Sequence, residues 1–165
     1  MNPSAPVCPV PAEQQPLNEY QELKESWFFR WATLGWAGYL KPIVILWLLS
    51  WLISAPVAAV SFPFAKYPVQ FLLSAGAGAM VIPALTLVRL YLGWIYVCNR
   101  LSQETIFYEE SGWYDGQCWQ KPAEVWQRDR LIVNYEIRAL LRRIQLTFIG
   151  LSSLLLANAM IWLFL

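Results

Sequence analysis

The sequence predicts an all-α membrane protein with three transmembrane helices, an N-terminal amphipathic helix at the membrane interface and a small insert on the cytoplasmic face. Residues 42–65 and 67–88 carry no charged side chain, and residues 144–165 contain only Gln145 and Asn158 as strongly polar side chains. Each stretch is long enough to cross the ~30 Å hydrocarbon layer at about 1.5 Å per residue. A hydrophobic content of 58% with only 14% charged residues excludes an ordinary soluble domain of 165 residues.

The distribution of basic residues predicts the orientation. Three precede the first span, Lys66 alone lies between the first and second spans, and eight fall between Arg89 and Arg143. Cytoplasmic segments are enriched in Lys and Arg, so the N-terminus and residues 98–143 are expected in the cytoplasm or the stroma, with Leu165 on the opposite side. A net charge of +1 gives no field that attracts nucleic acid. Membrane lipids are therefore expected partners, and nucleic acid is excluded.

Proline dominates the N-terminal segment, residues 1–17, which has five prolines and no basic residue. This composition predicts a disordered tail rather than a cleavable signal peptide. A helix is expected over residues 18–41, because Asn18 is a favourable N-cap and Gln21 stands three residues later. We expect this helix to lie on the membrane surface and to turn inwards at Lys41–Pro42. Its apolar stripe consists of Tyr20, Leu23, Trp27, Trp31 and Leu34.

Small residues in each predicted span indicate close packing between helices. In the second span, which extends over residues 67–97, Ser74/Gly78 and Ala75/Ala79 are pairs spaced by four. Pro83 is expected to kink this helix. Packing within the molecule explains such faces, and docking to another membrane protein is the alternative. The corresponding residues are Ser50, Ser54 and Ala58 in the first span and Gly150, Ser153 and Ala157 in the third.

The insert, residues 98–143, is expected to contain a β-hairpin and an amphipathic helix. Thr105–Tyr108 and Gln117–Gln120 favour strands, and two glycines between them favour a turn. Lys121–Pro122 suits the start of a helix that enters the last span. About 40 residues are too few for an independent core. The insert is therefore expected to pack on the membrane, on residues 18–39, or on a partner.

The turn between the two strands is the candidate partner-binding site. It combines large aromatic side chains with carboxylates, and Trp and Tyr often carry the binding energy of interfaces. The alternative, given equal weight, is that both rings fold back on the membrane surface or on Trp126. No catalytic or metal site is predicted, because adjacent strand carboxylates point to opposite faces and the chain contains no histidine. The candidate residues are Glu109, Glu110, Trp113, Tyr114 and Asp115.

Three arginines are candidate contacts for lipid headgroups or other anions. Arg89 follows the charge-free part of the second span and is expected to reach the lipid phosphates. At greater depth its charge would need a carboxylate or a ligand as partner. Arg128 and Arg130 flank Asp129 and are candidates for binding an anionic headgroup or a partner's carboxylate. The alternative for this pair is an ordinary solvated helix face.

The three cysteines, Cys8, Cys98 and Cys118, are predicted to be reduced. They form no Cys-x-x-Cys pair, and all would lie at or near the reducing side of the membrane. A regulatory thiol is the open alternative. No cofactor is predicted, because zinc and haem sites built on imidazole are excluded. A bound pigment or lipid is left open.

Five blocks of sequence are distinctive, namely residues 8–20, 26–28, 87–94, 108–116 and 128–131. Together they resemble the cyanobacterial and plastid membrane-protein family named for its conservation in the green lineage and diatoms, also grouped with hypothetical chloroplast reading frames. The resemblance covers nearly the whole chain and carries no catalytic residue over to it. It implies an integral protein of the thylakoid or plasma membrane in a cyanobacterium or plastid. The family pattern commonly has proline where this chain has Ala139, which implies that the helix entering the last span is in two pieces.

Two functions of different classes follow from these expectations. The first is a non-catalytic auxiliary protein of photosynthetic membranes that aids the assembly, stability or stress acclimation of a larger complex, because the polar insert is too small to fold alone and presents aromatic side chains. The alternative is a lipid-, carotenoid- or chlorophyll-handling membrane protein or enzyme, with Arg89 and the Tyr91/Trp94 face lining a pocket at the membrane boundary. Transport is disfavoured, because none of the three spans carries a charge well inside it.

Overall fold

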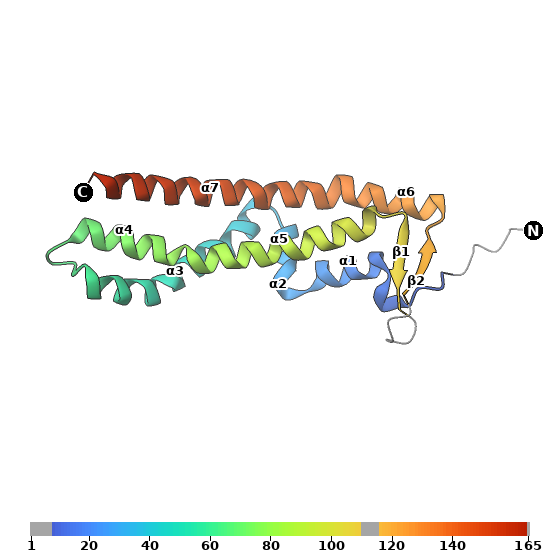
Figure 1. The fold of residues 1–165 in the computed structure, drawn as a ribbon, viewed down its shortest axis with the longest axis horizontal. Helices are drawn as coiled ribbons and strands as arrows, with labels where there is room; N and C mark the ends of the chain where they lie inside the picture. The colour runs from blue at the N-terminus through green and yellow to red at the C-terminus, as the bar shows by residue number, and fades with distance from the viewer. Residues whose placement is uncertain (1–7, 110–115, 165) are drawn as a thin grey trace, which may run out of the picture.

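The computed structural model describes residues 8–109 and 116–164, and most of them are helical. Figure 1 shows an elongated molecule in which the N-terminal segment, the β-hairpin and α6 gather at one end. The α3–α4 connection and the C-terminus lie at the other end. The elements in chain order are η1 (Ala12–Gln14), α1 (Pro16–Glu25), α2 (Trp27–Arg30), η2 (Trp31–Thr33), α3 (Trp36–Ser61), α4 (Pro68–Ala79), α5 (Val81–Ser102), β1 (Thr105–Tyr108), β2 (Gln117–Gln120), α6 (Ala123–Ile132), the π-helical turn η3 (Val133–Ile137) and α7 (Arg138–Leu163).

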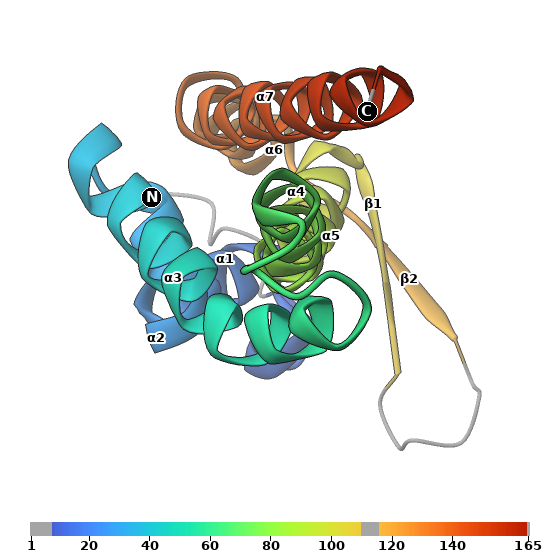
Figure 2. The ribbon, with the colours of Figure 1, turned by 90° about the vertical axis from the view of Figure 1, so that its left-hand side faces the viewer.

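Three helical segments are long and apolar enough to cross a membrane, as predicted. They are α3, the α4–α5 segment, and the continuous rod of α6, η3 and α7. Figure 2 shows α4 and α5 between α3 and α7, so the two outer helices both pack on the middle one. Their outward faces carry exposed large apolar side chains along most of their length. Such faces suit contact with lipid tails.

Small residues bring α3 and α4 close together, as the small-residue spacing predicts. Ala75 and Ala79 are completely buried, and Ser50 and Ala58 on α3 are nearly so. A Cβ atom added to Gly78 would lie 3.1 Å from the Cβ of Ser54. On α7 the predicted small face is exposed along Gly150, Ser153 and Ala157. Helix α7 instead contacts α4 through Asn158, whose Nδ2 donates a hydrogen bond to the carbonyl oxygen of Leu73 at 2.9 Å.

The second span is two helices, which meet at Met80, three residues before the Pro83 that was predicted to kink it. Helix α4 ends at Ala79, and α5 begins at Val81 after Met80, whose N–H bonds the carbonyl of Ala77 at 3.2 Å. Pro83 therefore lies in the first turn of α5. A proline there removes a donor that has no acceptor within the helix in any case. The irregularity falls on the residues just before Pro83, because a proline ring crowds the carbonyl of the residue four positions earlier, here Ala79.

The first span begins earlier than predicted. Helix α3 starts at Trp36 rather than near Pro42, and Gly35 is its N-cap residue in an extended conformation. Pro42 and Pro56 both lie inside the helix. Lys41 is therefore an exposed residue in the second turn of α3, and the chain turns inwards at Gly35.

The N-terminal segment corrects two further expectations. The predicted interfacial helix over residues 18–41 is broken at Ser26, which has extended ψ of 129° and serves as N-cap of α2. The predicted apolar stripe is therefore interrupted, and Trp27 is 86% exposed. Part of the predicted tail is ordered: η1 precedes α1, and α1 starts at Pro16 with Gln15 as N-cap. Asn18 is not the cap, and its Nδ2 donates to the carbonyl of Ala12 at 2.8 Å.

The hairpin and the helix after it are confirmed. Strands β1 and β2 pair antiparallel with Thr105 opposite Gln120 and Tyr108 opposite Gln117. Pro122 is the N-cap residue of α6. The helix continues through Ala139, so the break implied by the family resemblance is wrong for this chain, and the irregularity is instead the π-helical turn just before it.

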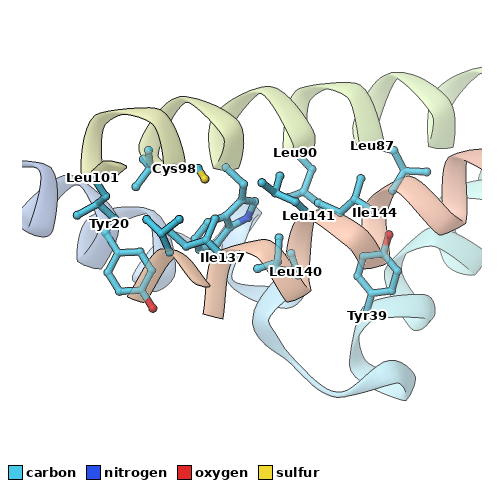
Figure 3. Packing of buried hydrophobic residues seen from close by; sticks show 14 of the residues in the cluster. Tyr20, Tyr39, Leu87, Leu90, Cys98, Leu101, Ile137, Leu140, Leu141 and Ile144 are labelled. Atoms are coloured by element: carbon cyan, nitrogen blue, oxygen red, sulfur yellow. The ribbon is translucent and has the colours of Figure 1, made fainter. Parts of the chain in front are cut away.

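A single apolar core joins the insert to the N-terminal helices. It lies where α5 meets η3, α7 and α1, as Figure 3 shows. The insert was expected to pack on the membrane, on residues 18–39 or on a partner. In the structure it packs on residues in and around α1 and α2. We call residues 8–34, 94–109 and 116–143 the head. The buried members are Tyr20, Ala32, Tyr39, Ile43, Leu87, Leu90, Trp94, Val97, Cys98, Leu101, Val133, Ile137, Leu140, Leu141 and Ile144.

Candidate functional site

The hairpin is held by the N-terminal segment. The side chain of Gln14 forms two hydrogen bonds with the backbone of Glu109, one from its Nε2 to the carbonyl oxygen and one from the amide N–H to its Oε1, both at 2.9 Å. Arg100 fixes the same segment, because its Nη2 donates to the carbonyl of Gln14 at 2.7 Å. An isolated two-stranded hairpin is marginally stable in water. The contacts with the N-terminal segment therefore stabilise the hairpin.

The two faces of the hairpin differ in burial. Ile106 and Tyr108 are buried on one face, where they pack with Val10 of the N-terminal segment. Phe107 on the other face is 65% exposed, and its partner Cys118 is also exposed. Figure 2 shows the hairpin standing out from the helical body. The Phe107 side chain is thus exposed on a hairpin that the N-terminal segment holds in place.

Four of the five predicted partner-binding residues lie outside the described residues, namely Glu110, Trp113, Tyr114 and Asp115. They fall in the sequence between β1 and β2. Glu109 is described, and it is exposed at the end of β1. Its backbone, rather than its carboxylate, makes the contacts with Gln14.

The three predicted anion-binding arginines are not brought together. Arg89 lies on α5, where its guanidinium sits 5.4 Å from the ring centre of Phe28. Arg130 lies on α6, 4.7 Å from the ring centre of Trp126. Arg128 is largely exposed and bonds its neighbour Asp129 at 3.4 Å. Each of the three cations is therefore placed on a helix surface, and no shared anion site is formed by them.

Asp129 is not part of a solvated face, contrary to the alternative considered for this segment. Its Oδ2 accepts a hydrogen bond from the Nζ of Lys121 at 2.8 Å, and both side chains are almost fully buried. Lys121 also contacts the carbonyl of Leu101 at 3.1 Å, at the C-terminus of α5. A cation is favourable at that end of a helix. The pair fixes the base of the hairpin between α5 and α6.

A second ion pair joins α1 to α5. Glu19 Oε2 lies 3.0 Å from Arg100 Nε, and both side chains are about four-fifths buried. Burial raises the pKa of the Glu19 carboxyl, and the nearby Arg100 charge opposes that rise. Arg100 therefore links α5 to α1 through Glu19, and α5 to the N-terminal segment through Gln14.

A polar cavity of about 230 Å³ opens between α1, η2 and the rod at η3. Tyr20 and Lys24, one turn apart on α1, converge on Glu136 of η3. The Tyr20 hydroxyl donates to the Glu136 carboxylate, and Lys24 Nζ lies 3.0 Å from the same oxygen. Lys24 Nζ also donates to the Tyr20 hydroxyl at 3.1 Å. The bonds to Tyr20 and Glu136 raise the pKa of the Lys24 ammonium group, which therefore stays charged.

Arg143 and Trp94 complete the wall of this cavity. Arg143 Nη1 donates to the carbonyls of Ala32 and Leu34, and its guanidinium lies 5.0 Å from the ring centre of Trp36. Trp94 is 1% exposed, and its indole N–H has no hydrogen-bond partner within the part of the chain that the structure describes. A buried donor without an acceptor is unfavourable by about 1–3 kcal/mol.

The sequence did not predict this cavity. The spacing of Tyr20 and Lys24 is compatible with one helix face, but Glu136 is 116 residues from Tyr20. Nothing local indicates that pairing. The pocket predicted from Arg89, Tyr91 and Trp94 is not formed by those residues, because Trp94 faces the α1 cavity while Tyr91 lines a separate hollow with Gln145.

Two further hollows lie along the candidate spans. One of about 460 Å³ follows α3, α4 and α5 and includes the hydroxyls of Ser50, Ser54 and Ser74. Another of about 260 Å³ is wholly apolar and lies between α3 and α7. No cluster of three or more metal-ligating side chains occurs in residues 8–109 and 116–164.

These features define a small helical protein with three helices able to cross a membrane and a head that contains a supported hairpin and a polar cavity. The chain belongs to the family described as CGLD27-like, Conserved in the green lineage and diatoms 27, whose family profile matches residues 8–150.

Individual relatives are similar over most of this chain. The protein ycf36 of Porphyra purpurea is 48% identical over 155 residues, which is 94% of each chain. The chloroplastic protein Conserved in the green lineage and diatoms 27 of Arabidopsis thaliana is 42% identical over 156 residues. That alignment includes 94% of this chain but 48% of the Arabidopsis protein, so this chain spans about half its length. No solved structure matches the chain.

Proposed function

We propose that the protein is a non-catalytic auxiliary of photosynthetic membranes, which aids the assembly, stability or stress acclimation of a larger membrane complex by binding it through the hairpin. The observation that carries this proposal is the supported hairpin with one covered and one uncovered face. Phe107 is 65% exposed on the uncovered face, while Val10 packs against the other. An aromatic side chain on an ordered projection binds at a low entropic cost.

The tip of the hairpin extends the proposed surface. Trp113, Tyr114 and Asp115 fall in the sequence between the strands, and we propose that they contact the same partner together with Glu109 and Glu110. Interfaces are enriched in Trp and Tyr at their centres. Phe107 would lie at the edge of this contact and the tip residues at its centre.

A photosynthetic membrane is the proposed location. A relative from Arabidopsis thaliana is named as chloroplastic, and three segments of this chain are long and apolar enough to span. The positive-inside rule favours the head on the cytoplasmic or stromal side. Arg128 and Arg130 on α6, and Arg89 on α5, would then face anionic headgroups or a partner's carboxylates from that side.

The test compares Phe107→Ala with the control Tyr135→Ala in native membranes. Tyr135 is 79% exposed on η3, away from the hairpin. Tagged protein is purified in mild detergent, and the co-purifying complex is identified and quantified by mass spectrometry. We expect Phe107→Ala to reduce recovery of one defined complex by about fivefold, as loss of an interface aromatic does. The combined Trp113→Ala and Tyr114→Ala variant is expected to abolish it.

Three results decide the proposal. Reduced recovery with Phe107→Ala, but unchanged recovery with Tyr135→Ala, supports docking through the hairpin. Unchanged recovery with both Phe107→Ala and the double tip variant contradicts it. Equal losses with Phe107→Ala and Tyr135→Ala also contradict it, since the effect would then not depend on the hairpin.

A second function is favoured by the hollow of about 460 Å³ along α3, α4 and α5. Ser54 Oγ is buried there without a hydrogen-bond partner among the described residues. Hydroxyl groups in an apolar groove suit an isoprenoid or pigment with a polar end group, which corresponds to lipid, carotenoid or chlorophyll handling. Absorption spectra and lipid analysis of purified protein test this function. A stoichiometric pigment supports it, and colourless protein with a random lipid content contradicts it.

A further inference from the structure

We propose that the α1 cavity binds an oxyanion, the phosphate or sulfonate headgroup of an anionic membrane lipid. Its wall contains the ammonium group of Lys24, the guanidinium of Arg143 and the indole of Trp94. This site is independent of the hairpin and of the partner proposed above.

The balance of donors and acceptors in the wall points to an anion. Glu136 is the carboxylate of the wall, and it already accepts bonds from Tyr20 and Lys24. Arg143 uses one of its nitrogens, Nη1, for backbone carbonyls in the hydrogen bonds given for it. A guanidinium has five N–H donors, so donors are left over. Lys24 and Arg143 together outweigh Glu136 by one positive charge.

Trp94 supplies an independent observation. Its indole N–H is buried and has no acceptor within the described residues. The indole nitrogen is a donor only, so its requirement is met by a group that accepts. Trp94 lines the same cavity as Lys24 and Arg143, and bonds from N–H donors to phosphate or sulfonate oxygens are short and strong.

The position of the cavity argues for a lipid as the source of the oxyanion. Arg143 is the last charged residue before the apolar end of α7, and the next residue begins a charge-free run to the C-terminus. Trp36, which stacks on Arg143, is 53% exposed at the start of α3. Exposed Trp beside Arg at the end of an apolar helix marks the headgroup level of a membrane. The cavity therefore lies at the depth of the lipid headgroups.

A separate apolar hollow lies further along α7, between α7 and α3. Its lining includes Ile43, Trp47, Pro83, Leu151 and Leu154. Leu151 lies roughly two helical turns below Arg143 on α7. The bond from Tyr39 to Thr147 at 2.9 Å links α3 and α7 between the two hollows. A lipid with its headgroup at Arg143 can lay an acyl chain along this hollow, outside the Tyr39 bridge.

The experiment measures which lipids stay bound to the full chain. The protein is placed in nanodiscs that contain equal amounts of phosphatidylglycerol, phosphatidylcholine and a neutral galactolipid, and retained lipids are counted by native mass spectrometry. We expect phosphatidylglycerol to be enriched about tenfold over the other two, which corresponds to the net gain of roughly one hydrogen bond. Arg143→Gln and Trp94→Phe are expected to reduce this enrichment to about twofold or less.

Arg142→Gln is the matched control, because Arg142 is the exposed neighbour of Arg143 on the same helix and is not in the cavity wall. It is expected to retain the enrichment. Arg143 also holds the carbonyls of Ala32 and Leu34, so Arg143→Gln can disturb the fold. Trp94→Phe keeps an aromatic ring and removes the N–H donor. Circular dichroism of each variant identifies any loss of fold.

The outcomes separate the sources of the oxyanion. Displacement of phosphatidylglycerol by millimolar inorganic phosphate shows that the site binds oxyanions and that free phosphate is a competing source. Resistance to inorganic phosphate assigns the site to the lipid. Enrichment of the galactolipid, no enrichment of any lipid, or equal effects of Arg142→Gln and Arg143→Gln overturns the proposal. Full enrichment in correctly folded Trp94→Phe and Arg143→Gln overturns it as well.

Discussion

Lys121 and Asp129 are charged side chains that the fold removes almost completely from solvent. Their exposed fractions are 6% and 2%, and the Nζ and Oδ2 atoms are 2.8 Å apart. Two charges in so apolar an environment are tolerated because each has a partner, and because Lys121 also contacts the carbonyl of Leu101 at the end of α5. The pair therefore specifies how the hairpin joins α5 and α6, more than it adds net stability.

Replacing one residue of the Lys121–Asp129 pair should destabilise the fold far more than replacing both residues. We expect Asp129→Ala to lower the free energy of unfolding by about 3 kcal/mol, because Lys121 would remain buried without a countercharge. The combined Lys121→Met and Asp129→Leu variant should recover most of this loss. Arg128→Ala, which changes a largely exposed neighbour, should stay within about 0.5 kcal/mol of wild type. Chemical denaturation in detergent micelles measures all three, and a double variant no better than Asp129→Ala would refute this account.

At the scale of the elements, the sequence predicted structure wherever a local pattern determined it. The strands Thr105–Tyr108 and Gln117–Gln120 were predicted at the observed bounds, because β-formers flank a turn that contains two glycines. The three spans were predicted because a run without charges is a local property. The close packing of α3 on α4 followed in the same way from the spacing of Ala75 and Ala79.

Elements whose ends depend on distant contacts were predicted poorly. The residues around Ser26 match a continuous helical stripe, yet the chain breaks there and Phe29 packs against Gly93, where an added Cβ would lie 2.5 Å from the ring. The order of the N-terminal segment depends on Gln14 and Glu109, which are 95 residues apart. The cavity residues were missed for the same reason, because Tyr20 meets Glu136 only after the whole head has folded.

The contact between the N-terminal segment and the hairpin gives a prediction at this scale. Gln14→Ala removes two hydrogen bonds to the backbone of Glu109 and leaves the carbonyl contact with Arg100 in place. We expect amide exchange in residues 105–108 and 117–120 to accelerate by about fivefold, because two exposed hydrogen bonds contribute roughly 1 kcal/mol. Hydrogen–deuterium exchange with mass spectrometry measures this effect. Glu13→Ala is the control, and unchanged exchange in Gln14→Ala would show that the hairpin is ordered without the N-terminal segment.

The whole molecule separates two kinds of surface along its length. The head contains the hairpin, the buried ion pair and the cavity. Figure 1 shows the hairpin at one end of the molecule, and α3, α4 and most of α7 expose apolar side chains toward the other. Arg143 and Trp36 lie where the two regions meet. The proposed hairpin contact and the proposed lipid site would therefore lie on the same side of a membrane. The lipid would lie at the headgroup level, and the partner would contact the hairpin farther from the membrane.

This division predicts an orientation that can be tested directly. Three crossings would place the head and the C-terminus on opposite sides of the membrane, and Figure 1 shows them at opposite ends of the molecule. Lys66 is the single basic residue between the first and second candidate spans, so the positive-inside rule predicts that the head faces the cytoplasm or stroma. Cysteine-reactive or protease-sensitive tags, one after Leu163 and one next to Gly116, report the two sides in sealed membrane vesicles. We expect the tag near Gly116 to be accessible from the cytoplasmic or stromal face and the tag after Leu163 to be protected. Accessibility of both tags from the same face would exclude three crossings, and with them the proposed depth of the lipid site.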